Sequence, residues 1–247
     1  MRLRLLPLLL ALAGCLGTSN TDDTAEIPWR SLTFDDFVNV NGTPDTWTRT
    51  PGGIRCTGVP LGGARSTRVF QNFELEFEWR HEAHAGNSGL FLWCPEAAFT
   101  DLPPGTLPRH GIEVQILDPG YEERFLQQNE RHSDWFTSHG DIFKVGEATC
   151  RATHPRRVYE APDGSTWEVS SRDATRSFPT ARITRSNGQW NHYRVLAVDG
   201  RVDLWVNGEH VNSVTHCSPA RGYLALESEG TPIDFRGLRI RELPTRS

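Results

Sequence analysis

The sequence predicts an all-β sandwich or barrel. Short segments in which apolar and polar residues alternate recur along the chain, and tight-turn pairs separate several of them. Helical periodicity is confined to residues 121–131, where we expect one or two turns at most. No internal repeat or second domain is evident, and a chain of 247 residues suits one all-β domain, which we place at residues 27–247.

The clearest strand lies at residues 73–80, where apolar and charged residues alternate without a break. Asp199-Gly200 and Asn207-Gly208 are typical hairpin turns, and they predict a three-stranded meander over residues 191–214. The other expected strands cover residues 88–93, 111–118, 223–227 and 233–243.

Two long segments, residues 95–109 and 120–185, are polar and rich in Pro, Gly and Arg. Loops of that length inside a compact domain are usually functional. We therefore expect them to form rims or lids around a site.

The amino terminus resembles a bacterial lipoprotein signal. Arg2 and Arg4 precede a short apolar run, and Leu12-Ala13-Gly14-Cys15 ends it with small residues. The run is too short for a bilayer, which needs about 20 apolar residues. We predict cleavage after residue 14, lipidation of Cys15, a polar tether at residues 15–26, and a lipid-anchored place in the cell envelope (periplasm or outer membrane). A plain secretory signal is the alternative.

The charge of the chain argues against a nucleic acid partner. The net charge is −5, and removal of residues 1–14, which hold two arginines and no acid, makes it −7. Lys144 is the only lysine, and the arginines are scattered rather than gathered in a basic stripe. Contact with a membrane is expected only through the amino-terminal lipid.

Four cysteines follow the predicted signal, namely Cys56, Cys94, Cys150 and Cys217. An oxidising compartment permits one or two disulfides in any of three pairings. None of the spacings is that of a zinc site. We expect structural pairing or burial rather than a catalytic thiol.

The segment 111–118 is the most informative for function. Its aliphatic residues point to one side, while Glu113 and Gln115 point to the other, about 7 Å apart along the strand. A carboxylate beside a primary amide can accept a proton and bind a hydroxyl group. The pair therefore predicts the floor of a polar-ligand site, with a solvated strand face as the alternative.

His139 and Asp141 flank Gly140 at the start of a short apolar run. An imidazole beside a carboxylate can relay protons or bind a metal ion. We predict a catalytic role for both residues, and the alternative is a turn with an exposed histidine.

Three more residues are candidates for substrate binding. Asn87 and Trp93 have the same parity on one predicted strand, and an amide near an indole can hold a sugar ring. Glu227 closes a late strand together with Glu229. The alternatives are that Trp93 belongs to the core and that both glutamates hydrogen-bond a turn.

Several blocks together resemble the 3-keto-disaccharide (3-keto-glycoside) hydrolase family over about residues 27–243. They are residues 73–93 with Asn87-Ser88-Gly89, residues 111–118, His139-Gly140-Asp141, residues 188–194, Val206-Asn207-Gly208 and residues 222–243. The resemblance implies a concanavalin A-like jelly roll of two antiparallel sheets, with the site on the concave sheet, and it implies export.

The resemblance also implies a reaction. A ketone at C3 of a sugar acidifies the proton on C2, so elimination can expel the group on C1, and water then adds to the enone. On that basis we cast Glu113 as the base and Gln115 as a donor to the sugar or to the enolate oxygen.

The other roles follow from the same hypothesis. His139, oriented by Asp141, would be the acid or would bind a divalent metal ion beside the ketone, which is the only cofactor considered. Asn87 and Trp93 would hold the ring, and Glu227 would contact the substrate. The implied partner is a carbohydrate.

Two other functions compete with this hypothesis. A non-catalytic carbohydrate-binding domain would use the same Asn, Trp and Gln side chains. A β-glucanase is suggested because 113–118 resembles the Glu-x-Asp-x-x-Glu strand of jelly-roll glucanases, but Gln115 and Asp118 depart from it. A retaining glycosidase needs two carboxyl groups about 5 Å apart, which this strand supplies poorly.

Overall fold

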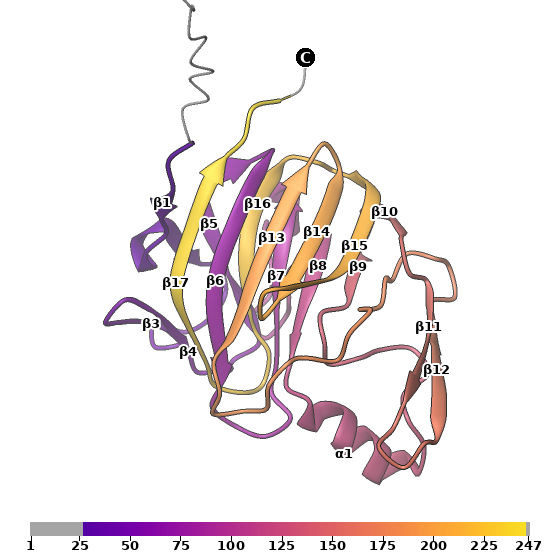
Figure 1. The fold of residues 1–247 in the computed structure, drawn as a ribbon. Coiled ribbons are helices and arrows are strands. Elements are labelled where there is room, and N and C mark those ends of the chain that lie inside the picture. Colours follow the sequence, from indigo (N-terminus) through magenta and orange to yellow (C-terminus); the bar gives the residue numbers. More distant parts are fainter. Residues whose placement is uncertain (1–26, 246–247) are drawn as a thin grey trace, which may run out of the picture.

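The computed structural model describes residues 27–245 as two β-sheets packed face to face (Figure 1). Neighbouring strands in both sheets are antiparallel. This confirms the predicted all-β sandwich of two antiparallel sheets.

The larger sheet runs, in spatial order, through β10 (Thr149–Ala152), β15 (Glu209–Ser218), β14 (Arg201–Val206), β13 (Asn191–Val198), β6 (Phe73–His81), β17 (Ile233–Glu242), β4 (Gly53–Cys56) and β3 (Trp47–Thr50), with β1 (Arg30–Ser31) paired to β17. The smaller sheet runs through β2 (Phe37–Asn39), β5 (Gly62–Phe70), β16 (Gly222–Ser228), β7 (Asn87–Cys94), β8 (Gly111–Leu117) and β9 (Ile142–Val145).

Alternation along β6 explains how the larger sheet is covered on both sides. Phe73, Leu75 and Phe77 are buried in the cluster of apolar side chains that holds the sheets together. The charged residues that alternate with the apolar ones form ion pairs on the other face, for example Glu78 with Arg236 at 2.7 Å. Such exposed pairs contribute little to stability, so the buried face is what fixes the strand.

The predicted meander is present with its expected turns. Strands β13, β14 and β15 pair in sequence, and Asp199 and Asn207 adopt positive φ angles of 48° and 50° ahead of their glycines. Two consecutive positive φ angles define the type I′ turn that matches strand twist.

The region predicted as long loops contains more regular structure than expected. Helix α1 (Gly120–Asn129) has ten residues, longer than the one or two turns predicted. The hairpin of β11 (Arg156–Glu160) and β12 (Thr166–Ser170) and the strands β9 and β10 were not predicted, because all four are only four or five residues long. Figure 1 shows α1 and the β11–β12 hairpin together at one end of the sandwich. Single 3-10 turns occur at η1 (Phe34–Asp36) and η2 (Glu96–Ala98).

Trp93 does not share the outer face with Asn87, so that prediction is wrong. Leu92 and Trp93 of β7 together oppose Leu224 of β16, since Phe91 pairs with Ala225 and Cys94 with Tyr223. This bulge, with φ 58° at Trp93, reverses the parity of the strand. The indole is buried in the core and donates a hydrogen bond to Gln71 O at 2.8 Å.

The four cysteines Cys56, Cys94, Cys150 and Cys217 are free thiols in the described part of the chain, so none forms the disulfide that we considered. Three are buried and Cys150 is partly buried, as the alternative of burial predicted.

Cys15 and the predicted signal and tether lie outside the described residues, and the predictions made for them stay predictions. Within residues 27–245, no helix combines the length and apolar character needed to cross a membrane.

Candidate active site

A hollow of about 280 Å³ lies on the outer face of the smaller sheet. Strands β7, β8 and β16 form its floor, and side chains from α1 and from the segments around residues 107, 135 and 176 form its walls. It is lined by Asn87, Leu107, Glu113, Gln115, Leu117, Tyr121, Trp135, Phe136, Phe143, Arg176, Glu227 and Glu229. Four of the residues predicted for the site, Asn87, Glu113, Gln115 and Glu227, are therefore brought together here.

Gly89 allows two carboxyl groups from different strands to meet. A Cβ atom on this glycine would lie 2.4 Å from Glu227 Oε2 and 2.9 Å from Glu113 Oε1. Both oxygens therefore lie over the backbone of β7, and their separation cannot exceed the sum of those two distances. Any side chain at this position would collide with both groups.

Glu113, Glu227 and Glu229 hold their protons more strongly than isolated glutamates. Burial, the charge of Glu229 and the charge of Asp141 raise the pKa of Glu113 to about 8, although Arg176 opposes the shift. Burial and the neighbouring charges of Glu113 and Glu229 raise the pKa of Glu227 well above its usual value. Carboxyl groups this close cannot all be ionised together.

Glu229 has the smaller shift of the three. Burial raises its pKa to about 7, against hydrogen bonds to Glu227 and Asn87 that lower it. Glu227 differs from it, because its Oε2 atom is buried and has no hydrogen-bond partner within residues 27–245. In this cluster Glu227 keeps its proton, and Glu229 beside it loses its proton near neutral pH.

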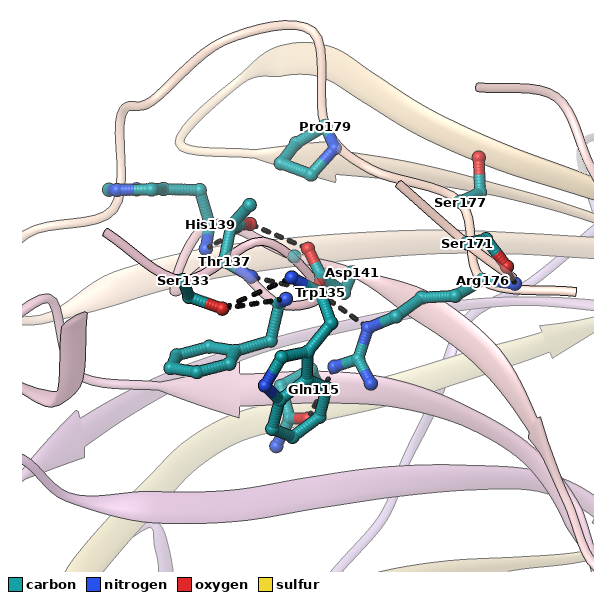
Figure 2. A network of polar contacts seen from close by, with 12 residues as sticks. Gln115, Ser133, Trp135, Thr137, His139, Asp141, Ser171, Arg176, Ser177 and Pro179 are labelled. Carbon is teal, nitrogen blue, oxygen red and sulfur yellow. Dashed lines mark hydrogen bonds and ion pairs between the residues drawn. The ribbon is translucent and has the colours of Figure 1, made fainter. Parts of the chain in front are cut away.

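Arg176 places a positive charge beside the carboxyl cluster. Its Nε donates to Asp141 Oδ2 at 2.8 Å, and its terminal nitrogen donates to Gln115 Oε1 at 3.3 Å (Figure 2). The guanidinium lies over the ring of Phe143, 4.0 Å from its centroid, and the side chain is 14% exposed. A cation fixed in this way can stabilise negative charge that develops in the hollow.

Gln115 has its amide engaged by the protein. Because Arg176 donates to the oxygen, the amide nitrogen is the group that faces Asn87 Oδ1 at 2.9 Å and Ser88 O at 3.3 Å. Both of its N–H groups are therefore used. The predicted role of Gln115 as a donor to the sugar is not supported by these contacts, which position Asn87 and Arg176 instead.

The structure does not pair Asp141 with His139 as predicted. Asp141 is fully buried and accepts hydrogen bonds from Thr137 N at 2.9 Å and Thr137 Oγ1 at 2.5 Å in addition to Arg176. Figure 2 shows the imidazole of His139 turned away from this carboxylate. Asp141 therefore anchors Arg176, and this agrees with its absence from the lining of the hollow.

His139 instead holds helix α1. Its Nδ1 accepts a hydrogen bond from Thr184 N at 3.2 Å, so Nε2 carries the hydrogen that faces Glu122 Oε2 at 3.4 Å. Glu122 also pairs with Arg182 at 2.7 Å. Burial lowers the pKa of His139, against the effect of Glu122, and the ring is neutral at pH 7. It is absent from the lining of the hollow, so these contacts do not support the catalytic acid predicted at this position.

Asp118 ties three backbone segments together. It accepts hydrogen bonds from Ala85 N at 2.8 Å, Gly120 N at 3.0 Å and Asn187 N at 2.5 Å, and it is buried. Asp118 therefore matches the last acid of the glucanase motif in sequence spacing only, since its carboxylate is used by backbone N–H groups. The second carboxyl group that the strand 111–118 lacks comes from Glu227 on β16.

Sequence reasoning missed Arg176 and the aromatic wall formed by Tyr121, Trp135, Phe136 and Phe143. All come from the long segment 120–185, whose length was the only available signal.

A larger hollow, about 560 Å³, lies near β1, β3 and β4, but no acidic or histidine side chain lines it. Within residues 27–245, no group of three or more His, Cys, Asp or Glu side chains is arranged to hold a metal ion.

The fold and the site together define a concanavalin A-like sandwich with a carboxyl-lined hollow. The chain belongs to the family of 3-keto-alpha-glucoside-1,2-lyase-like domains, which matches residues 28–241. This confirms the family predicted from the sequence. No curated protein sequence matches the chain.

Solved structures share the fold at low sequence identity. A candidate glycosyl hydrolase from Parabacteroides distasonis superposes with a TM-score of 0.54 at 20% identity, over 86% of this chain and 90% of that one. A carbohydrate-binding module from Bacillus subtilis gives 0.52 at 11% identity, over 84% and 96%. The exoplasmic domain of VIP36, in a Ca²⁺- and Man2-bound form, gives 0.50 at 12% identity, over 89% and 82%.

Proposed function

We propose that the protein cleaves the glycosidic bond of 3-keto-glycosides by elimination followed by hydration. The observation that supports this best is the carboxyl cluster over Gly89, in which groups of different proton affinity lie beside the guanidinium of Arg176. The family match supports the same chemistry, because its members are described as 3-keto-alpha-glucoside-1,2-lyase-like domains.

Glu113 is the base in this proposal. Its carboxylate removes the proton from C2, and the electrons of that C–H bond pass into an enolate on the C3 ketone. A carboxylate with a pKa of about 8 is a stronger base than an ordinary glutamate, which suits removal of a proton from carbon.

Glu227 is the acid, and Arg176 binds the C3 oxygen. The enolate electrons form the C1–C2 double bond, the C1–O bond breaks, and the departing oxygen takes the proton of Glu227. Arg176 stabilises the negative charge on the C3 oxygen meanwhile. Water then adds across the double bond, with its oxygen on C1 and a proton on C2, and the product is the free 3-keto sugar.

The cluster suits this chemistry better than double displacement at C1. A retaining glycosidase needs one ionised carboxylate as its nucleophile beside one protonated acid. Burial here raises the pKa of Glu113 to about 8, so its carboxylate is a strong base toward a C–H proton but is present only in part at neutral pH, where a nucleophile would have to be ionised. A ketone that acidifies the C2 proton removes the need for such a nucleophile.

The decisive experiment uses 3-keto-trehalose in deuterated water. We expect release of glucose and of 3-keto-glucose that carries deuterium at C2, while trehalose itself and β-glucan stay intact. Cleavage without deuterium at C2 would contradict elimination, and cleavage of the unoxidised sugars would favour a glycosidase of the ordinary kind.

A carbohydrate-binding domain without catalysis is the second candidate, favoured by the fold shared with a carbohydrate-binding module. It predicts binding of the same sugars with no glucose released. Under that reading, Glu113→Gln would bind as the unmodified protein does and neither would turn over.

A further inference from the structure

A second hollow, about 450 Å³, adjoins the carboxyl-lined one. Trp135 and Arg176 line both hollows and form the wall between them. The other lining residues of the second hollow are Ser170 at the end of β12 and Ser171, Arg172 and Asp173 in the turn that follows.

The indole of Trp135 is fixed but open to solvent. Ser133 Oγ accepts hydrogen bonds from Trp135 N at 3.2 Å and Phe136 N at 3.1 Å, which holds the backbone, as Figure 2 shows. The ring packs on that of Phe136 at 4.8 Å between centroids and near the Arg176 guanidinium at 5.4 Å, yet 52% of the residue is exposed. A rigid aromatic face open to water suits the apolar side of a sugar ring.

The polar side of the second hollow offers both a donor and an acceptor. Arg172 is exposed and has no hydrogen-bond or ion-pair partner within residues 27–245. Asp173 Oδ1 accepts from Thr175 Oγ1 at 2.8 Å and Ser171 Oγ at 3.2 Å, while Oδ2 has no partner in the described chain. A guanidinium that donates hydrogen bonds and a carboxylate that accepts them, both in the lining of one hollow, match the hydroxyl groups of a neutral sugar.

We propose that the second hollow binds the sugar that departs from C1 when the substrate is a 3-keto-disaccharide. This inference rests on the proposed function, which places the reacting ring in the carboxyl-lined hollow. The leaving sugar then lies across the wall, with its ring on Trp135 and its hydroxyl groups on Arg172 and Asp173. A glycoside with a small leaving group would leave this hollow empty.

The test compares kcat/KM for 3-keto-trehalose with kcat/KM for methyl 3-keto-α-glucoside. We expect the unmodified protein to prefer the disaccharide by about tenfold or more, the gain from one good set of contacts. Trp135→Ala and Arg172→Ala should each lower this preference at least about fivefold, and Trp135→Phe should restore most of it.

Two controls match these variants. Trp205 stacks on Arg194 on the outer face of the larger sheet, and Arg221 is exposed in the turn before β16. Trp205→Ala and Arg221→Ala should keep the preference unchanged. Equal kcat/KM values for the two substrates, or a preference that survives both Trp135→Ala and Arg172→Ala, would overturn the second subsite while leaving the proposed function intact.

A binding measurement separates the two proposals if neither sugar is cleaved. Calorimetry with the Glu113→Gln variant gives the affinity ratio of the same two sugars without turnover. A ratio of about tenfold that falls in the Arg172→Ala double variant supports the subsite even when the reaction fails. Equal affinities, or no binding of either sugar, overturn it.

Discussion

At the scale of single residues, the site depends on Glu113, Glu227 and Glu229 sharing one hollow with Arg176. Crowded carboxyl groups do not ionise together, so the cluster keeps protons at a pH where separate glutamates have lost them. A reaction that both removes and supplies a proton needs one ionised and one protonated carboxyl group. The sequence of a single strand does not reveal this cluster, because the three groups come from β8, β16 and the turn after β16.

Glu113→Gln tests the base directly. The amide cannot accept the C2 proton, so we expect kcat on 3-keto-trehalose to fall about 10²- to 10⁴-fold while KM changes little. Turnover near that of the unmodified protein would remove Glu113 from the role. Steady-state kinetics with glucose detection provides the measurement, and Glu78→Gln, on the outer face of the larger sheet, is the matched control.

The pH dependence follows from the same group. Glu113 acts only after it loses its proton, and its pKa is raised to about 8, mainly by burial. We therefore expect kcat/KM to rise with pH through about 8. A rate that is already level between pH 5 and pH 7 would contradict this assignment.

At the scale of elements, β8 was predictable and its surroundings were not. Alternation fixed which side Glu113 and Gln115 face, because one register buries the aliphatic residues. The bulge at Trp93 left no mark in the alternation, and the approach of Glu227 depends on Gly89 in a neighbouring strand. Arg176 lies in a loop, where no strand or helix periodicity predicts which side chains face the site.

Helix α1 is held in place by His139, Glu122 and Arg182. Although burial acts the other way, hydrogen bonds from His139 and Arg182 lower the pKa of Glu122 to about 2, so the carboxylate is ionised within a buried network. These contacts connect α1 to the segments at residues 139 and 182, near the wall of the hollow.

His139→Gln separates this structural role from the catalytic one predicted from sequence. Loss of the network should cost about 1–3 kcal/mol and lower Tm by several degrees. Turnover of the folded variant should fall less than about tenfold, since loss of a catalytic acid would cost about 10²- to 10⁴-fold. Calorimetry and kinetics below Tm distinguish the two roles.

At the scale of the whole molecule, the fold could be predicted further than the site. Short alternating strands and two type I′ turns indicated the sandwich, because each is a local signal. The rim around the hollow is assembled from polar segments that are distant in sequence and that meet only in the folded chain.

The amino terminus remains a prediction that can be tested in cells. We expect the protein with its own leader to incorporate labelled palmitate and to sediment with membranes, because Cys15 would carry the lipid. Cys15→Ser should abolish both, and Cys56→Ser, at a buried thiol, is the control for labelling. An unlabelled protein in the soluble fraction would contradict lipidation.

The crowded glutamates also give turnover and thermal stability opposite dependences on pH. Glu113 and Glu229 bind protons more tightly in the folded chain than unfolded, with pKa values raised to about 8 and about 7 from 4.5, so unfolding free energy declines as pH climbs from about 4.5 to 8. Glu122, whose pKa is lowered, adds stability above about 4.5 that disappears towards pH 2. Thermal melts should therefore peak in mild acid, whereas turnover should rise towards mild alkali. The active form, in which Glu113 is ionised, would then have a lower Tm than the protonated form. The inactive Glu113→Gln variant should have a higher Tm than the active form.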